Sequence, residues 1–330
     1  MHLAARILAT ASALLGRAVD TATVAKIAMP ERSAADVEAR TGIASRYWVE
    51  PGTTMASQGA VAVQRALEDA GLVAADLRRI IFTNSTGGDY LMPATANALA
   101  DALGVADTCD CFDVNNACVG FLTSIDIAAR SVVTGLGPVA VVSSEIGSYH
   151  IRADDPRPYV VFGDAAAAAI IGAARPDGDE GIIGSSFGNH GALRDTVWMG
   201  HAGRTGGHGK DETIRFHKSN RDITAIAIDG LERSARQVFA QSGLGWQDVD
   251  WVVPHQPNGS MLAQIVDHFG IAPTKVVPVV HEIGNVGSCS TAVGLDRLLR
   301  TRDVRPGHII LLIGVGAGLS YGALLYRVGQ

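Results

Sequence analysis

Two stretches of the sequence read alike: AVQRALEDAGLVAADLRRIIFT at residues 62–83 and SARQVFAQSGLGWQDVDWVVPH at residues 234–255, which align without a gap at an offset of 172. Each predicts an amphipathic helix that ends at a Gly-Leu pair, because glycine readily adopts the left-handed conformation that stops a helix. A short turn, an aspartate and an apolar run rich in β-branched residues follow, and such a run is typical of a strand covered on both faces. The chain therefore contains an internal repeat.

A second pair of stretches extends the repeat. Residues 112–143 and 280–315 each contain a polar turn, a helix that is apolar nearly all round, a turn with glycine and proline, and a buried strand, and strands at 164–172 and 321–328 follow them. A helix that is apolar on every side is normally buried, so we expect these two helices to lie between two sheets. The sequence therefore predicts an α/β fold made of a duplicated unit, with helices on both faces of each sheet.

The predicted joint between the two copies is ARPDGDEG at residues 174–181, whose proline, glycines and charges are typical of a linker. We therefore expect an N-terminal half over residues 1–174 and a C-terminal half over residues 182–330. GHAGRTGGHGK at residues 200–210 interrupts the regular plan. Its two histidines lack a third metal ligand at a recognisable spacing, so we predict a mobile surface loop or lid there, and no metal site.

Composition excludes several classes of protein. The chain has 330 residues, of which 47% are hydrophobic and 18% charged, enough for a sizeable globular core. A formal net charge of -6 gives no electrostatic footprint for nucleic acid. No stretch approaches the roughly 20 uninterrupted apolar residues of a membrane-spanning helix. The opening MHLAARILATASALLG resembles a signal peptide only weakly, and we interpret it as a buried first strand of a cytoplasmic protein.

Cys118 is the first candidate catalytic residue. It lies in NNACVGFL, where a polar turn enters the first of the two buried helices. Backbone amides at a helix N-terminus stabilise a thiolate, so this position favours a nucleophile with a lowered pKa. Cysteine is also among the most often buried residue types, and a core role is our interpretation of Cys109, Cys111 and Cys289. The Cys109-Cys111 pair has no partner pair at metal-ligand spacing.

His255 and Asn285 are two further candidates. His255 lies in WVVPHQPNG at the end of a predicted strand, where α/β sheets bind ligands, and Asn285 lies in EIGNVGS. Each alone is also compatible with a structural role, as a hydrogen-bonded core histidine or an Asx-turn residue. The repeat changes this balance, because Thr83 matches His255 and the Cys118 and Asn285 turns match each other. Three reactive side chains are thus predicted to converge between the halves, an arrangement typical of acyl transfer through a nucleophile.

NNACVGFL, PHQPN and GNVGS resemble the active-site motifs of the β-ketoacyl-acyl-carrier-protein synthase III family of the thiolase superfamily, and the resemblance covers essentially the whole chain. It implies a five-layered α/β/α/β/α fold, usually in a homodimer. It also implies that Cys118 accepts an acyl group from an acyl-coenzyme A, with the backbone amides of Cys118 and Ala317 as the oxyanion hole. His255 and Asn285 would stabilise the enolate formed when a malonyl thioester loses carbon dioxide. Coenzyme A is then part of a substrate, and no resident cofactor or metal is expected.

The resemblance assigns further residues and shows departures from the family. It implies coenzyme A contacts for Arg40 and Arg157. Asp36 stands where the family has a tryptophan that stacks on adenine. Met92 stands where a phenylalanine commonly lines the acyl pocket across the dimer, and a flexible methionine would admit a different or longer acyl chain.

The surface expected to meet an acyl carrier protein also departs from the family. Ser260 and the Asp267-His268 pair replace an arginine and a Lys-Lys pair. Carrier proteins are acidic, so this replacement weakens docking and makes housekeeping fatty-acid initiation doubtful. Three functions stay open: decarboxylative condensation in a specialised pathway, acyl transfer without decarboxylation to an alcohol, amine or second acyl thioester, and a non-catalytic partner subunit. The complete Cys, His and Asn set favours the first.

Overall fold

A computed structural model of the chain describes residues 1–200 and 212–329. Residues 201–210 of the predicted loop, with His201 and His208, lie outside the described residues.

The first sheet has five strands in the order β1-β7-β6-β4-β5. β4 runs parallel to both β5 and β6, whereas β7 is antiparallel to β6 and to β1. As predicted, the apolar start of the chain forms a first strand. Two helices, α3 and α4, pack on the outer face of this sheet. The bounds are β1 Ala5–Ala13, α3 Met55–Ala70, β4 Arg79–Thr83, α4 Thr95–Ala102, β5 Asp110–Val114, β6 Val139–Ile146 and β7 Asp164–Ala173.

The second sheet repeats this order as β8-β13-β12-β11, with the same pattern of parallel and antiparallel pairs. The match to β5 shrinks to a single parallel bridge between Val252 and Val276. Helices α7 and α8 cover the outer face. The bounds are β8 Gly181–Asn189, α7 Asn220–Ser242, β11 Trp251–Pro254, α8 Gly259–His268, β12 Ile309–Gly316 and β13 Ser320–Arg327.

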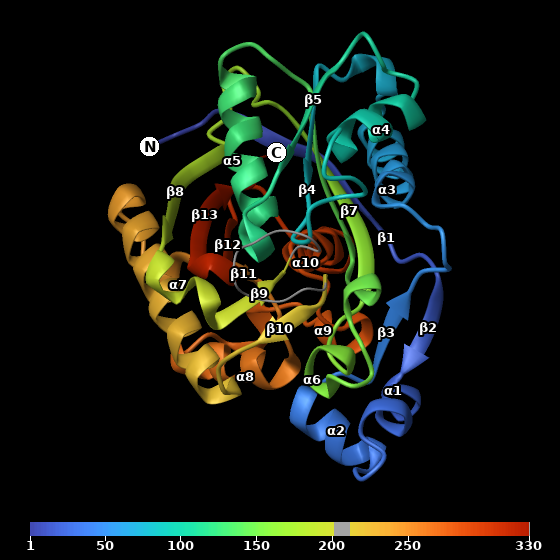
Figure 1. Cartoon of the computed structure of the whole chain (residues 1–330). Coiled ribbons are helices and arrows are strands. Elements are labelled where there is room, and N and C mark those ends of the chain that lie inside the picture. Colours follow the sequence, from blue (N-terminus) through green and yellow to red (C-terminus); the bar gives the residue numbers. More distant parts are fainter. Residues whose placement is uncertain (201–211, 330) are drawn as a thin grey trace.

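Two helices fill the space between the sheets: α5 (Gly120–Val133) and α10 (Cys289–Thr301). Leu122 and Leu295 on these helices share one buried core with residues from both sheets, such as Val141 and Leu312. Figure 1 shows α10 end-on near the centre of the molecule, between the two sheets. The layers are therefore α/β/α/β/α, which confirms the predicted fold class.

The aligned stretches fold in the same way at their predicted offset. Both helices end at a glycine in the left-handed conformation, Gly71 with φ 67° and Gly243 with φ 73°. The 3₁₀ turns that follow span Ala74–Asp76 and Trp246–Asp248. Asp76 and Asp248 occupy equivalent positions in these turns, and each side chain accepts a hydrogen bond from the backbone N–H three residues earlier.

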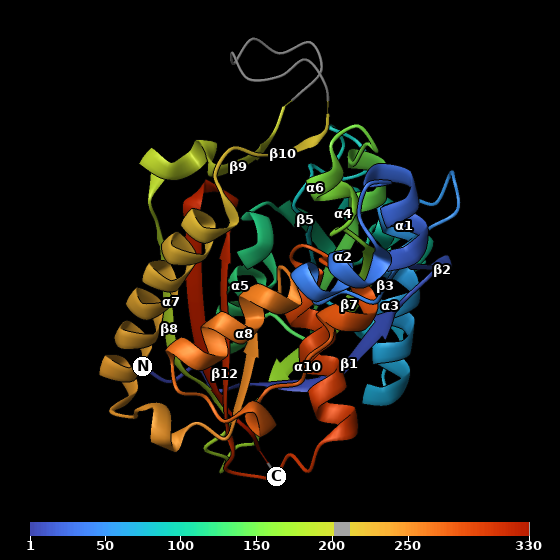
Figure 2. The same cartoon turned by 90° about the horizontal axis from the view of Figure 1, so that it is seen from below.

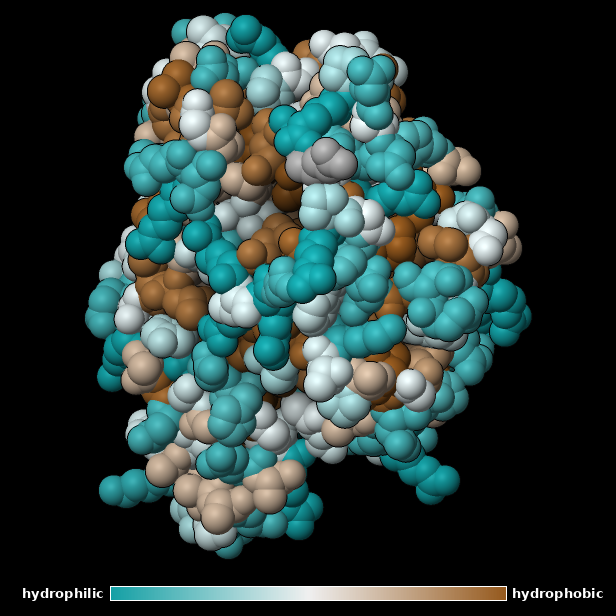
Figure 3. Space-filling model, turned by 180° about the vertical axis from the view of Figure 1, so that it is seen from behind, coloured by the Kyte–Doolittle hydropathy of each residue, from teal (hydrophilic) through white to brown (hydrophobic). Residues whose placement is uncertain are grey.

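The other elements gather around one end of the sheets, where Figure 2 shows β9, β10, α6 and α1. Within the described part of the chain, no helix is both long and apolar enough to cross a membrane. On the face opposite to the view of Figure 1, hydrophobic side chains form separate patches among hydrophilic ones (Figure 3). The remaining bounds are β2 Arg17–Asp20, α1 Thr21–Ala28, α2 Ala34–Thr41, β3 Ser45–Trp48, α6 Pro156–Tyr159, β9 Val197–Met199, β10 Ile214–Phe216 and α9 Val280–Ile283.

Candidate active site

Cys118 lies in the turn between β5 and α5, as the sequence predicted. The residue before it, Ala117, has a φ of 45°, a left-handed conformation that is uncommon for a residue with a side chain. The Asn115 side chain holds this turn by accepting a hydrogen bond from the Ala117 N–H at 3.1 Å. The turn places the thiol where the second half of the chain contacts the first.

The C-terminal half meets Cys118 through the turn after β12. A Cβ atom added to Gly316 would lie 2.7 Å from the Cys118 nitrogen, so only glycine lets the two backbones approach this closely. The backbone N–H of Ala317 and that of Cys118 itself both donate toward the Cys118 sulfur. The two amides expected to form an oxyanion hole thus surround the thiol.

The environment of Cys118 favours a neutral thiol. Burial is the main cause, and with the charge of Glu145 it raises the pKa of Cys118 to about 12, although the two amides and the Ser85 hydroxyl act in the opposite direction. The expectation that the helix start lowers this pKa is therefore wrong in its net effect. The amides contribute as expected, but the loss of solvent outweighs them.

His255 follows β11 at the carboxyl end of the strand, and its backbone N–H donates to the Ile313 carbonyl at 2.8 Å. Its side chain is buried, which lowers the pKa of His255 to about 4, so the imidazole is neutral at pH 7. Gly314 separates it from the nucleophile: a Cβ there would lie 3.4 Å from the His255 Cβ and 4.0 Å from the Cys118 carbonyl oxygen. Nδ1 of His255 is buried and has no hydrogen-bond partner among the described residues.

Asn285 is held by the N-terminal half. Its N–H donates to the Val161 carbonyl at 2.9 Å, and its own carbonyl accepts from the Gly163 N–H at 3.0 Å. The side-chain Oδ1 accepts from the Gly287 N–H at 3.0 Å. Because Oδ1 is engaged in this way, Nδ2 is the end of the amide left to donate to a ligand.

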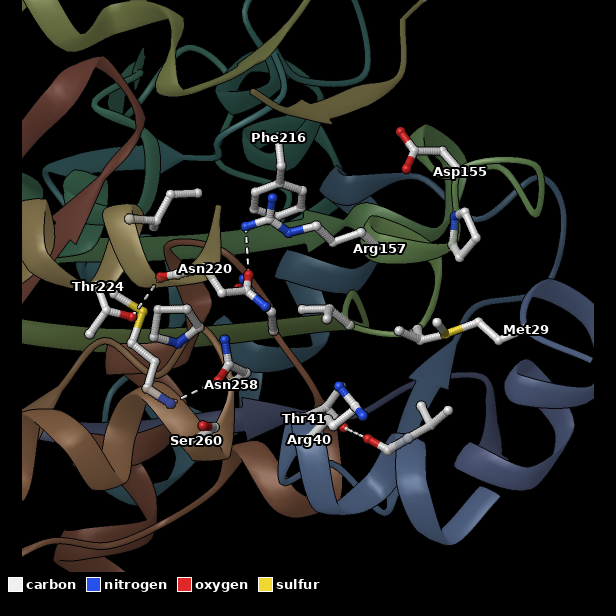
Figure 4. Close-up of a pocket in the computed structure, with 18 of the residues that line it drawn as sticks. Met29, Arg40, Thr41, Asp155, Arg157, Phe216, Asn220, Thr224, Asn258 and Ser260 are labelled. Carbon is white, nitrogen blue, oxygen red and sulfur yellow. Dashed lines mark hydrogen bonds between the residues drawn. The ribbon is translucent and has the colours of Figure 1, made fainter. Parts of the chain in front are cut away.

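A cavity of about 440 Å³ reaches Asn285 from the surface. Both halves of the chain line it, and Figure 4 shows Arg40 on α2 and Arg157 on α6 among its walls. Cys118 and His255 are not among its lining residues. One side of the cavity forms where α2 meets α8, and this contact needs two glycines: a Cβ on Gly42 would lie 2.6 Å from the Gly259 Cα.

The arginines of the cavity already have partners in the protein. Arg40 Nε and Arg32 Nη1 both donate to the Asp36 carboxylate, each at 2.9 Å. Arg157 donates to the Asn220 side chain at 2.6 Å, and its guanidinium carbon lies 4.4 Å from the centre of the Phe216 ring (Figure 4). Sequence reasoning missed Arg32 and Phe216, because neither stands in a motif and the fold alone brings them to the cavity.

Met92 does not line this cavity. Its side chain is 86% exposed, and Tyr90 and Leu91 beside it are also exposed. The role of Met92 in an acyl pocket therefore stays a prediction. Such a role needs a second copy of the chain, as the resemblance implies.

The residues expected near a carrier protein lie on or next to α8. Ser260 lines the cavity, and Asp267 lines a neighbouring apolar groove. His268 forms a hydrogen bond of 2.8 Å with Glu232 of α7. Within residues 1–200 and 212–329, no group of three or more side chains could hold a metal ion.

Comparisons with known proteins identify the family. A family model described as 3-oxoacyl-[acyl-carrier-protein (ACP)] synthase III matches residues 112–191, and its C-terminal counterpart matches residues 239–328. The chain is 32% identical to a β-ketoacyl-[acyl-carrier-protein] synthase III of Chlamydia caviae, over 87% of each chain. It belongs to this family.

A second synthase III, from Rhizorhabdus wittichii, is 30% identical over 97% of this chain and 98% of its own. Among solved structures, the priming β-ketosynthase of the R1128 polyketide biosynthetic pathway superposes with a TM-score of 0.89 at 30% identity. The superposition covers 100% of this chain and 97% of the priming β-ketosynthase. The protein is thus an acyltransferase of the synthase III family with a thiolase-like fold.

Proposed function

We propose that this protein transfers an acyl group from coenzyme A to Cys118 and condenses it with a malonyl thioester. The observation that carries the proposal is that turns from both halves of the chain meet around Cys118, across Gly316 and Gly314. Cys118 lies under the Ala317 amide, with His255 across Gly314 and Asn285 at the cavity. The proposed reaction needs no resident cofactor.

In the first step the Cys118 sulfur forms a bond to the carbonyl carbon of the acyl thioester, and the bond from that carbon to the coenzyme A sulfur breaks. The thiol proton leaves on coenzyme A, so charge is balanced. Because the thiol is neutral beforehand, it must lose its proton as it attacks. The amides of Cys118 and Ala317 stabilise the oxyanion that forms meanwhile.

In the second step a malonyl thioester loses its carboxylate as carbon dioxide, and the electron pair remains as an enolate. His255 and Asn285 donate hydrogen bonds to the enolate oxygen. No separate base is needed, because the departing carbon dioxide leaves the carbanion equivalent behind, and burial keeps His255 neutral as a hydrogen-bond donor. The enolate carbon then attacks the acyl carbonyl, the bond to the Cys118 sulfur breaks, and the sulfur takes up a proton.

The proposed acyl donor, extender and metabolic role rest on the cavity arginines, on the residues of α8 that differ from the family, and on one structural relative. Arg40 and Arg157 at the cavity support coenzyme A as the carrier of the first acyl group. Asp267 and the His268-Glu232 pair give α8 few cations for an acidic carrier protein, so the extender is carried by coenzyme A or by a carrier protein that docks differently. The similarity to a priming ketosynthase of a polyketide pathway supports a role in specialised metabolism.

A homodimer is part of the same proposal, because the exposed Met92 lines an acyl pocket only if a second copy receives it. The cytoplasmic location stays a prediction. Size-exclusion chromatography with light scattering measures the oligomeric state directly.

The proposed function is tested by incubating the protein with labelled acyl-coenzyme A and a malonyl thioester, carried either by coenzyme A or by a carrier protein. We expect label on Cys118 and release of carbon dioxide together with a β-ketoacyl product. Label on Cys118 without carbon dioxide release, followed by transfer to an alcohol, amine or second thioester, would contradict the condensation. No label at all would contradict the acyltransferase proposal and favour a partner subunit.

Asp36 is predicted to weaken the binding of coenzyme A. Its carboxylate neutralises Arg32 and Arg40 beside the cavity, so Asp36→Asn should lower the KM for acyl-coenzyme A by about 2- to 5-fold at low salt. Steady-state rates with acyl-coenzyme A and with an acyl-pantetheine, which lacks the nucleotide phosphates, measure the effect. The KM for acyl-pantetheine should stay the same.

The matched control is Asp229→Asn on α7, where Asp229 and Arg233 form the same kind of helical ion pair. This substitution should leave both KM values unchanged. If Asp36→Asn changes the KM for both donors equally, the nucleotide phosphates are not bound beside Arg40.

A further inference from the structure

Glu145 is a buried carboxyl group to which the mechanism above gives no role. It lies near the carboxyl end of β6, in register with Ala165 of β7, and its side chain is 3% exposed. Burying an ionised carboxylate is costly unless hydrogen bonds replace its water. A residue of this kind between two sheets therefore needs compensating partners, and those partners indicate what it does.

The partners come from both halves of the chain. From the N-terminal half, the Ser85 N–H donates to Oε2 at 3.1 Å and the Ser85 hydroxyl to Oε1 at 2.7 Å. From the C-terminal half, the Ser288 N–H and hydroxyl donate to Oε1 at 2.9 and 2.6 Å. These two backbone N–H groups and two hydroxyls favour the ionised carboxylate, although burial acts in the opposite direction and raises the pKa of Glu145.

These bonds join the loop after β4 to the turn that carries Asn285. Gly287, whose N–H holds the Asn285 side chain, packs directly on the carboxylate: a Cβ there would lie 2.7 Å from Glu145 Oε1. On the other side, the Ser85 hydroxyl that donates to Glu145 also interacts with the Cys118 thiol. Glu145 thus lies between the nucleophile and the turn that presents the amide donor.

We propose that Glu145 is a positioning residue that sets the place of the Asn285 turn relative to Cys118 and keeps its negative charge beside the resting thiol. The proposal rests on the proposed function, since it gives Asn285 the task of stabilising an enolate. It adds a division of roles: Asn285 contacts the substrate, whereas Glu145 acts through the turn and through its charge.

The charge has its own consequence for Cys118. Because a negative charge nearby disfavours the thiolate, Glu145 contributes to the raised pKa of Cys118. Two other titratable groups face this region, the Cys289 thiol on α10 and the His255 imidazole beyond Gly314. Burial raises the pKa of Cys289 and lowers the pKa of His255 to about 4, so both are neutral at pH 7.

Glu145→Gln tests the proposal because it removes the charge and leaves one of two backbone N–H donors without an acceptor. The pH dependence of Cys118 alkylation by iodoacetamide should then move to lower pH by about one unit, so that alkylation at pH 8 becomes faster. Carbon dioxide release from a malonyl thioester should fall at least about tenfold, because the Asn285 turn is no longer fixed. A merely structural role would not make the thiol more reactive while decarboxylation declines.

Asp296→Asn is the matched control. Asp296 is another buried carboxylate, on α10, and it accepts hydrogen bonds from the Thr10 and Ser12 hydroxyls and from Arg300, none of which acts on the Cys118 thiol. It should leave the pH dependence of Cys118 alkylation unchanged. If Glu145→Gln fails to fold, Ser288→Ala removes one donor and leaves the charge in place, so decarboxylation should fall while the alkylation profile stays as in the unmodified protein.

Equal losses of acylation and decarboxylation in Glu145→Gln, with no change in the alkylation profile, would overturn the proposal. An unaltered decarboxylation rate in Ser288→Ala would also overturn it. The alkylation profile needs no substrate. If the unmodified protein releases no carbon dioxide, the proposed function fails, whereas an unmoved profile in Glu145→Gln counts against Glu145 alone.

Discussion

Replacing Cys118 by alanine is expected to lower acyl transfer by at least about 10³-fold while carbon dioxide release from a malonyl thioester stays within about tenfold of its starting rate. The sulfur is the atom that carries the acyl group, so without it the first step has no nucleophile. His255 and Asn285 belong to other turns and remain in place, so decarboxylation keeps its hydrogen-bond donors. Mass spectrometry after exposure to acyl-coenzyme A measures the adduct, and trapped labelled carbon dioxide measures the second reaction.

Cys111→Ala is the control for this prediction. Its thiol is partly exposed and accepts a hydrogen bond from Asn97, and it lies on β5, outside the turn that carries Cys118. The variant should acquire the same adduct mass as the unmodified protein and turn over at the same rate. An adduct that persists in Cys118→Ala but disappears in Cys111→Ala would show that Cys111 is the acylated residue and would contradict the assignment of Cys118.

The repeat is the part of the fold that the sequence predicted best. Helix stops, turns and strands at an offset of 172 reappear in the structure with matching bounds, because each depends on local signals: a glycine at the stop, an aspartate in the turn, an apolar run in the strand. Local signals also placed Cys118 before a buried helix and His255 after a buried strand. Sequence reasoning succeeded where neighbouring residues determine the outcome.

Sequence reasoning failed for properties that depend on contacts from many parts of the folded chain. The pKa of Cys118 depends on burial by both halves and on Glu145, which is 27 residues away along the chain, and a helix start alone gives the opposite sign. Glu145 itself stands in no catalytic motif, and its partners Ser85 and Ser288 are separated by most of the chain. Phe216 on β10 contacts Arg157 on α6 only in the folded chain. Such contacts follow from the packing of layers and have no spacing rule.

Two causes of lost activity can be distinguished by experiment: a change at the Cys118 thiol and the loss of a hydrogen-bond donor to the enolate. A change that acts on the thiol shows in the pH dependence of its alkylation, whereas a change that removes a donor to the enolate leaves that dependence unaltered. Glu145→Gln is expected to move the alkylation profile, because it alters a charge beside Cys118. A substitution of Asn285 should leave the profile in place, because the amide is neutral and is held by Gly287.

Asn285→Ala is accordingly expected to lower decarboxylation by about 10²- to 10³-fold, the usual cost of removing one donor from a developing oxyanion. Acylation of Cys118 should stay within about threefold, because its oxyanion is stabilised by the backbone amides of Cys118 and Ala317. Single-turnover acylation, followed by mass, and carbon dioxide release under the same conditions measure the two steps separately. Equal losses in both would show that Asn285 maintains the site as a whole and has no role specific to the enolate.

Asn285→Asp decides between loss of the donor and loss of the turn. An aspartate keeps an oxygen to accept the Gly287 N–H, so the turn is preserved, but it no longer donates and adds a negative charge where the enolate forms. If the donor matters, this variant should decarboxylate as slowly as Asn285→Ala while it still acquires the acyl adduct on Cys118. Decarboxylation by Asn285→Asp at nearly the unmodified rate would show that neither the donor nor a neutral side chain is needed at this position, and the enolate-stabilising role would have to pass to His255 alone.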